Sequence, residues 1–137
     1  MKTEVHFHST AFNTTEPKDY FINECCFGDD LAKWLIGQLR AKGFQTDDAP
    51  GQEDFGWYFN FQVGGVEHCL VIGLQPNEPA TEDKWLCEIE RHTGFLGSIF
   101  GRRKHGILPE AIQAIDAAIK SSPDISRISW HEPGKDD

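Results

Sequence analysis

The chain has 137 residues, of which 39% are hydrophobic and 26% are charged, and its formal net charge at pH 7 is -9. This composition is typical of one globular domain, and the negative charge disfavours nucleic-acid binding, which depends on Lys and Arg at the phosphates. No apolar run approaches the roughly 20 residues of a membrane-spanning helix, and the first residues, MKTEVHFHST, do not form a signal peptide, so we predict a cytoplasmic protein without membrane contact.

The predicted elements begin with a strand over residues 3–12. Val5 and Phe7 alternate there with His6 and His8, and this period of two is typical of a strand with one buried face. A polar connection is predicted to follow. Its two adjacent cysteines do not readily bridge each other, which favours reduced thiols.

A helix is predicted over residues 29–42. Its apolar side chains recur at helical spacing and form one stripe: Leu31, Trp34, Leu35 and Leu39. Acidic residues occupy the first turn, and Gly43 is expected to end the helix in the left-handed conformation. A short strand over residues 44–46 and a turn-rich loop over residues 47–54 are expected next.

Residues 55–74 are predicted to form a β-hairpin at the centre of the sheet. Aromatic residues alternate with small or polar ones before Gly64 and Gly65, and this pair suits a two-residue turn. The turn places Val63 opposite Val66 and thereby fixes the rest of the register. One face of the hairpin is then aromatic or aliphatic apart from a single histidine, and we expect the helices to cover that face.

The remaining elements follow the hairpin in a simple order. They are a loop over residues 75–83, a strand over 84–92, a glycine-rich basic loop over 93–106, a helix that begins at Pro109 and ends at 121–123, a strand over 125–130 and a polar tail over 132–137. No repeat or linker is visible. We therefore predict one α+β domain over residues 1–131, a two-layer sandwich in which two amphipathic helices cover one face of a largely antiparallel sheet.

Three segments carry a resemblance to a known group of sequences. They are FINECCFGDDLAKWLIGQLRAKGF at residues 21–44, PGQEDFGWYF at residues 50–59 and GFLGSIFG at residues 94–101. With these segments the chain resembles an uncharacterised family of small bacterial proteins. The resemblance implies a bacterial, cytoplasmic, single-domain protein, and it brings no activity, ligand or catalytic residue with it.

The first candidate site is the polar face of the hairpin. In the predicted register Gly56 lies opposite Gly73, which leaves bare backbone where a ligand or another chain can approach. The predicted binding residues of this face and its entrance are Glu53, Asp54, Gly56, Tyr58, Asn60, Glu67, Cys69 and Gly73. The structural alternative is a solvent-facing surface whose glycines ease the twist of the sheet or a helix crossing.

The second candidate site is the loop over residues 94–105. Arg102, Arg103 and Lys104 follow an apolar run there, and the flanking glycines allow exposed amides to bind an anion. The loop lacks the Lys followed by Ser or Thr that marks a phosphate-binding loop. The alternative is a surface loop whose apolar residues cover the core and whose cations neutralise nearby acids.

Metal binding and catalysis have weaker support in the sequence. His6 and His8 share a strand face, but the short ligand spacings of zinc sites, CxxC and HxxxH, do not occur. A cysteine nucleophile with a histidine base can be drawn, yet no GxSxG, HExxH or dinucleotide-binding pattern is present. We therefore predict no metal, no cofactor and no catalytic residue.

The main hypothesis is a non-catalytic binding protein whose ligand is another protein, with an immunity- or inhibitor-like role by analogy. The alternative is a small-molecule-binding protein or small enzyme that combines the hairpin face with the arginine loop: Tyr58, Asn60, Glu67, Cys69, Arg102 and Arg103. A third hypothesis is phosphate or nucleic-acid backbone contact through Arg102, Arg103 and Lys104. A homodimer is compatible with all three.

Overall fold

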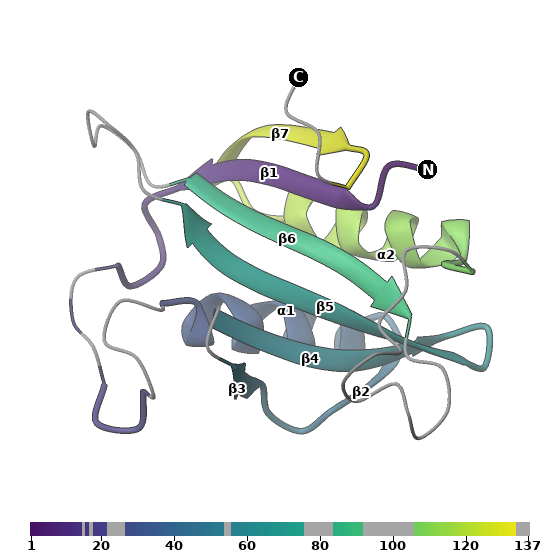
Figure 1. The fold of residues 1–137 in the computed structure, drawn as a ribbon, viewed down its shortest axis with the longest axis horizontal. Coiled ribbons are helices and arrows are strands. Elements are labelled where there is room, and N and C mark those ends of the chain that lie inside the picture. Colours follow the sequence, from purple (N-terminus) through teal and green to yellow (C-terminus); the bar gives the residue numbers. More distant parts are fainter. Residues whose placement is uncertain are drawn as a thin grey trace.

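The computed structural model describes residues 1–14, 16, 18–21, 27–53, 56–75, 84–91 and 106–133. These residues form two helices, α1 (Asp29–Ala41) and α2 (Pro109–Lys120). They also form seven strands: β1 (Glu4–Ser9), β2 (Gln45–Thr46), β3 (Gly51–Glu53), β4 (Gly56–Val63), β5 (Val66–Gln75), β6 (Lys84–Arg91) and β7 (Ile125–His131) (Figure 1).

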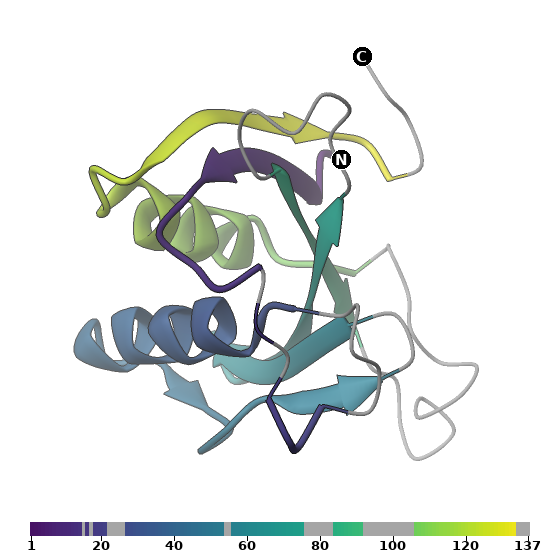
Figure 2. The ribbon, with the colours of Figure 1, turned by 90° about the vertical axis from the view of Figure 1, so that its left-hand side faces the viewer.

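The described strands belong to one sheet in the order β2-β4-β5-β6-β1-β7, and β3 pairs separately with β4. The pairings between these strands are antiparallel. Both helices lie against the same face of the sheet, and the sheet curves around them (Figure 2). The predicted α+β architecture, with two helices on one face of an antiparallel sheet, is therefore confirmed.

The central hairpin has the predicted register. Val63 lies opposite Val66, and the pairing of β4 with β5 continues in step from there. Gly64 and Gly65 adopt φ angles of 60° and 76°, which a residue with a Cβ adopts only under strain. The aromatic face packs against the helices, as predicted, and Phe59 on it is completely buried.

Helix α1 packs an apolar stripe into the core. Its buried apolar residues are Leu31, Ala32, Leu35, Ile36 and Leu39. Trp34, which was predicted to share this stripe, is half-buried at its border. The first turn is fixed by the hydroxyl of Tyr20, which donates a hydrogen bond to the buried Asp29 carboxylate. That bond raises the pKa of Tyr20 to about 12, because the anionic phenolate would lose it.

Helix α2 is tied to the hairpin by a buried histidine. Pro109 occupies its first turn, as predicted. The amide of Leu108 donates to His68 Nε2 at 3.1 Å, so the ring hydrogen lies on Nδ1 and is donated to the carbonyl oxygen of Val66, also at 3.1 Å. Burial lowers the pKa of His68, although the bond to Val66 opposes this shift. His68 is therefore a neutral side chain that connects the hairpin to the start of α2.

Several boundaries differ from those predicted, most of them by one residue. β1 ends at Ser9 and not at residue 12, and β7 continues to His131. Residues 51–53, predicted as part of a loop, form β3 and pair with the start of β4. A strand of three residues is too short to show a period in the sequence, which explains why it was missed.

The hydrophobic core fills the space between the sheet and the helices. Its largest side chains with under 2% exposure come from both layers: Trp85, Phe7, Phe59, Phe61, Leu31, Leu35, Leu39, Leu70, Ile72, Ile89, Ile115 and Ile119. Trp85, Cys87 and Ile89 point inward from β6, as predicted. Neither α1 nor α2, the helices of the described residues, is long and apolar enough to cross a membrane.

Candidate functional site

The face of the sheet opposite the helices, called the open face below, carries most of the polar side chains of the strands. Neither α1 nor α2 covers it (Figure 2). Strand alternation places several ionisable and hydroxyl side chains of β1, β6 and β7 on this face: Glu4, His6, His8, Lys84, Glu88, Arg127, Ser129 and His131. Because the core fills the helix face, binding residues of the sheet have to lie on the open face.

The predicted hairpin residues that the structure describes lie on the open face, and two of them line a common cavity. Asn60 lies opposite Cys69, and Glu67 lies opposite Gln62, as the predicted register requires. Asn60 and Glu67 line a small cavity. Cys69 is completely buried at the centre of β5 and offers no accessible thiol.

The predicted glycine pair has a structural explanation. Gly56 has a φ of 148°, and a Cβ there would lie 2.4 Å from the carbonyl oxygen of Ile72 and 3.6 Å from the Cα of Gly73. The neighbouring strand therefore fills the space that a side chain would take. The ring of Tyr58 likewise occupies the space beside a glycine. A Cβ at Gly51 would lie 2.6 Å from that ring.

Of the other predicted binding residues, one lies in β3 and the rest lie outside the described residues. Glu53 lies in β3, opposite Gly56. Asp54, Arg102 and Arg103 lie outside the described residues, together with the whole of the second candidate loop. The predicted combination of hairpin face and arginine loop therefore stays a prediction.

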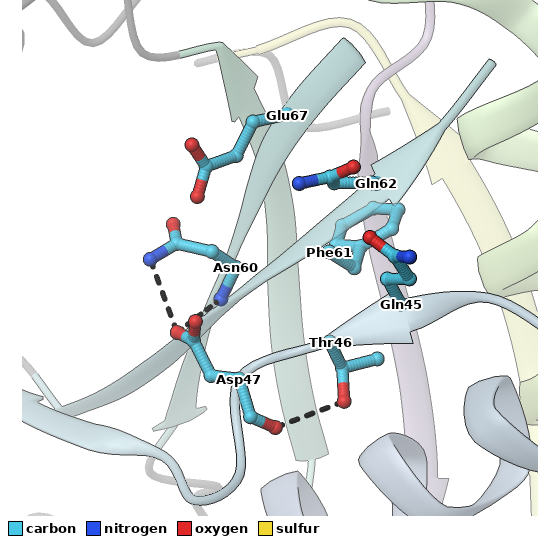
Figure 3. Close-up of a pocket in the computed structure, with 7 residues that line it drawn as sticks. All are labelled: Gln45, Thr46, Asp47, Asn60, Phe61, Gln62 and Glu67. Carbon is cyan, nitrogen blue, oxygen red and sulfur yellow. Dashed lines mark hydrogen bonds between the residues drawn. The ribbon is translucent and has the colours of Figure 1, made fainter. Parts of the chain in front are cut away.

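A first cavity, called the amide cavity below, lies where β2 pairs with β4 (Figure 3). Its volume is about 120 Å³. It is lined by Gln45, Thr46, Asp47, Asn60, Phe61, Gln62 and Glu67. Asp47 Oδ2 accepts hydrogen bonds from the backbone N–H and the side-chain amide of Asn60, at 2.9 and 3.0 Å. Asn60 and Glu67 were predicted, whereas the contribution of β2 and Asp47 was not.

A second cavity, called the histidine cavity below, lies over β5, β6, β1 and β7. Its volume is about 340 Å³. It is lined by His6, His8, Gln75, Lys84, Arg127, Ser129 and His131. Gln75 lies opposite Lys84, which in turn lies opposite His8. His6 lies opposite Ser129, so strand pairing alone brings most of the lining together.

Buried and hydrogen-bonded side chains form part of the histidine cavity. His6 and His131 are 5% and 8% exposed, and their ring centroids are 4.3 Å apart. His6 Nε2 donates to the carboxylate of Glu4 at 2.8 Å, since a carboxylate can only accept. Ser129 Oγ lies 2.8 Å from His131 Nε2. Both rings are therefore held in place by neighbouring side chains.

Arg127 reaches the histidine cavity through a β-bulge. His8 pairs with Ser126 and His6 pairs with Ser129, so β7 contains one residue more than β1 between these two pairs. Arg127 lies in this bulge with a φ of 53°, the one positive φ among the described residues other than glycine. Such a backbone costs a residue with a Cβ about 1–2 kcal/mol. Bulges of this kind often redirect a side chain beside a functional site.

The chemistry of the histidine cavity is that of an anion site. Within the part of the chain that the structure describes, no three His, Cys, Asp or Glu side chains are grouped to hold a metal ion. Cys87 is buried in the core, and burial raises the pKa of its thiol, so it offers no nucleophile. Lys84 and Arg127 supply positive charge and directed N–H donors, which together suit carboxylate or phosphate oxygens.

Of the residues of this cavity, only His6 and His8 were predicted as candidate site residues, as possible metal ligands. The other residues lie at the ends of β5 and β6 and on β7, which pairs with β1 although the two strands lie near opposite ends of the chain. One signal was present in β7. Arg127, Ser129 and His131 alternate there and therefore share a face.

The chain matches no protein-family model, no curated protein and no solved structure. The resemblance to an uncharacterised bacterial family, the cytoplasmic location and the partner protein therefore stay predictions. The function has to be argued from the geometry of the two cavities.

Proposed function

We propose that the protein binds a small anionic ligand in the histidine cavity, through a carboxylate or phosphate group of that ligand. One observation carries the proposal. Each of the seven residues that line the cavity has an N–H or O–H donor, and none has a carboxylate, although the whole chain has a net charge of -9. A lining with two cationic side chains and no carboxylate, on so acidic a chain, fits a ligand that supplies anionic oxygens.

Lys84 and Arg127 provide the permanent charge of the site. The planar guanidinium of Arg127 can donate to two oxygens of one carboxylate or phosphate. The backbone of Arg127 supports the same function. Strain such as its φ of 53° is found most often at functional sites, where other interactions compensate for it.

His6 and His131 line the cavity with rings whose positions are already fixed. Each is more than nine-tenths buried and lies 2.8 Å from a polar partner, Glu4 and Ser129 respectively. These two side chains already have few accessible rotamers before a ligand binds. The entropy lost on binding is therefore small, which favours affinity.

The size of the cavity favours a small molecule. Its volume of about 340 Å³ lies at the lower end of the roughly 300–1,000 Å³ that is usual for small-ligand sites. The proposal therefore follows the small-molecule alternative of the sequence analysis, with different residues. The partner protein of the main hypothesis stays a prediction.

Isothermal titration calorimetry with inorganic phosphate and with succinate tests the proposal. We expect wild-type protein to bind at least one of the two anions, and the preferred anion identifies the ligand group as phosphate or carboxylate. Arg127→Gln and Lys84→Gln are each expected to weaken binding about tenfold or more, because a hydrogen bond to a charged group contributes roughly 1.5–3 kcal/mol.

Lys18→Gln is the matched control, since Lys18 is exposed and does not line the cavity. It removes the same charge and is expected to leave both affinities unchanged. The proposal is wrong if neither anion binds, or if Lys18→Gln weakens binding as much as Lys84→Gln does.

A further inference from the structure

We infer that the amide cavity is a binding site for a divalent cation, with Ca²⁺ as the best-fitting ion. The inference does not depend on the anion site, because the two cavities share no residue. It rests on the acceptor oxygens that the amide cavity collects and on one buried oxygen among them.

The backbone fixes the position of Asp47 in the cavity. β2 and β4 pair so that Gln45 lies opposite Gln62 and Thr46 opposite Phe61. The amide of Asp47, the next residue, donates to the carbonyl oxygen of Asn60 at 3.0 Å and extends this pairing. The Asp47 carboxylate is thus placed on one side of the cavity by the sheet itself.

Asn60 presents an oxygen to the cavity. Its side-chain nitrogen donates to Asp47 Oδ2 at 3.0 Å, and the opposite orientation of the amide would bring two acceptors together. The amide oxygen therefore faces away from Asp47, and Figure 3 shows it on the side of Glu67. This Oδ1 atom is buried, and no donor reaches it within the residues that the structure describes. A buried acceptor of this kind calls for a water molecule or an ion.

Glu67 supplies the second carboxylate. It lies opposite Gln62 on the neighbouring strand, is exposed, and lines the same cavity as Asn60. None of the seven lining residues is cationic. Arg40 lies nearby, but the bonds of its guanidinium go to the Asp48 carboxylate, the Thr46 hydroxyl and the backbone oxygens of Thr46 and Asp47, not to the Asp47 carboxylate.

The donor set selects the class of ion. Carboxylate and amide oxygens are ligands of hard cations, and the lining has no His or Cys for softer metals. Ca²⁺ accepts six to eight oxygens in flexible geometry, whereas Mg²⁺ demands a near-ideal octahedron. A cavity of about 120 Å³ also has room for water ligands, at about 30 Å³ per water.

Calorimetric titration of chelator-treated full-length protein with CaCl₂ tests the site. We expect one ion to bind with a Kd of about 0.1–1 mM, the range of weak calcium sites, because only two carboxylates contribute. Glu67→Gln removes one of these charges and is expected to weaken binding about tenfold. Glu110→Gln, in the first turn of α2, is the matched control and is expected to have no effect.

Asn60→Asp gives a second test with the opposite sign. The variant places a second carboxylate against Asp47, so its Tm in chelator is expected to fall. CaCl₂ is expected to restore the Tm and to bind about tenfold more tightly than in the wild type, because the ion now has three carboxylate ligands. A variant whose Tm does not respond to CaCl₂ overturns the inference.

Two other results would also contradict the proposed cation site. The inference is overturned if CaCl₂ does not bind the wild type at about 10 mM, or if Glu67→Gln and Glu110→Gln have equal effects. Arg127→Gln is expected to leave CaCl₂ binding unchanged. A failure of the anion site and a failure of the cation site are thus distinguishable in the same set of proteins.

Discussion

His68 is the polar residue on which the packing of α2 against the hairpin depends. Its Nε2 accepts from the amide of Leu108, just before α2, while its Nδ1 donates to Val66. Both bonds require the neutral ring. A proton on Nε2 would face the amide hydrogen of Leu108, and the complete burial of the ring disfavours its charged form. The lowered pKa of His68 follows from that burial.

The stability of the protein is therefore expected to decrease as the pH falls below about 6.5, the ordinary pKa of histidine. His68 then takes up a proton in the unfolded chain, whereas the folded chain resists protonation until its lower pKa is reached. The free energy of unfolding consequently falls with falling pH across this window. Urea unfolding at several pH values between about 7 and 5 measures the slope.

His68→Gln is the comparison for this measurement. We expect it to be less stable at pH 7 by about 1–3 kcal/mol, the usual effect of disturbing a buried hydrogen bond. Its stability is expected to depend less on pH than that of the wild type, because one titrating group has been removed. An equal slope in both proteins would mean that other groups cause the pH dependence.

At the scale of elements, the bulge in β7 allows two isoleucines on either side of it to face the core. Ile125 and Ile128 are three residues apart, so a regular strand would turn them to opposite faces. The extra residue allows both to contribute to the core, since Ile125 is 7% exposed and Ile128 packs against the core cluster. The same extra residue leaves Arg127 beside Ser129 in the lining of the histidine cavity.

Arg127→Gly is expected to separate stability from binding. Glycine adopts a φ of 53° without a Cβ contact, so the free energy of unfolding is expected to rise by about 1 kcal/mol in urea unfolding. The variant is nevertheless expected to bind phosphate or succinate as weakly as Arg127→Gln does. A loss of stability would indicate that the arginine side chain, through its own contacts, maintains the bulge.

The hairpin and the two helices could be predicted because their signals are local. A period of two before Gly64 and Gly65, or an apolar stripe after Pro109, lies within a few residues of sequence. The neighbours of β1 could not be predicted, because they depend on the packing of segments from distant parts of the chain. For this reason Asn60 and Glu67 were assigned to the correct face, whereas the histidine cavity was not assembled from the sequence.

At the scale of the whole molecule, β5 connects two cavities of opposite chemistry. Glu67 lines the amide cavity near its start, and Gln75 lines the histidine cavity at its end. At about 3.3 Å per residue the strand between them spans about 26 Å. Two unit charges at that distance interact by only about 0.2 kcal/mol in water, and salt reduces this further.

Binding at the two cavities is therefore expected to be independent. Glu67→Gln is expected to change the Kd for phosphate and succinate by less than about twofold, measured by calorimetry without CaCl₂. The variant makes the chain less negative, so a general attraction of anions would strengthen their binding. A larger gain in affinity would therefore show that net charge, and not the local donor set, controls the anion site.

β7 is the outermost described strand on its side of the sheet. An outermost strand presents unpaired backbone groups to which another chain can add, and such additions lead to aggregates. The extra residue of β7 breaks the even spacing of these groups, and the arginine at that point would lose water if a further strand were added. The distortion therefore disfavours extension of the sheet at this edge.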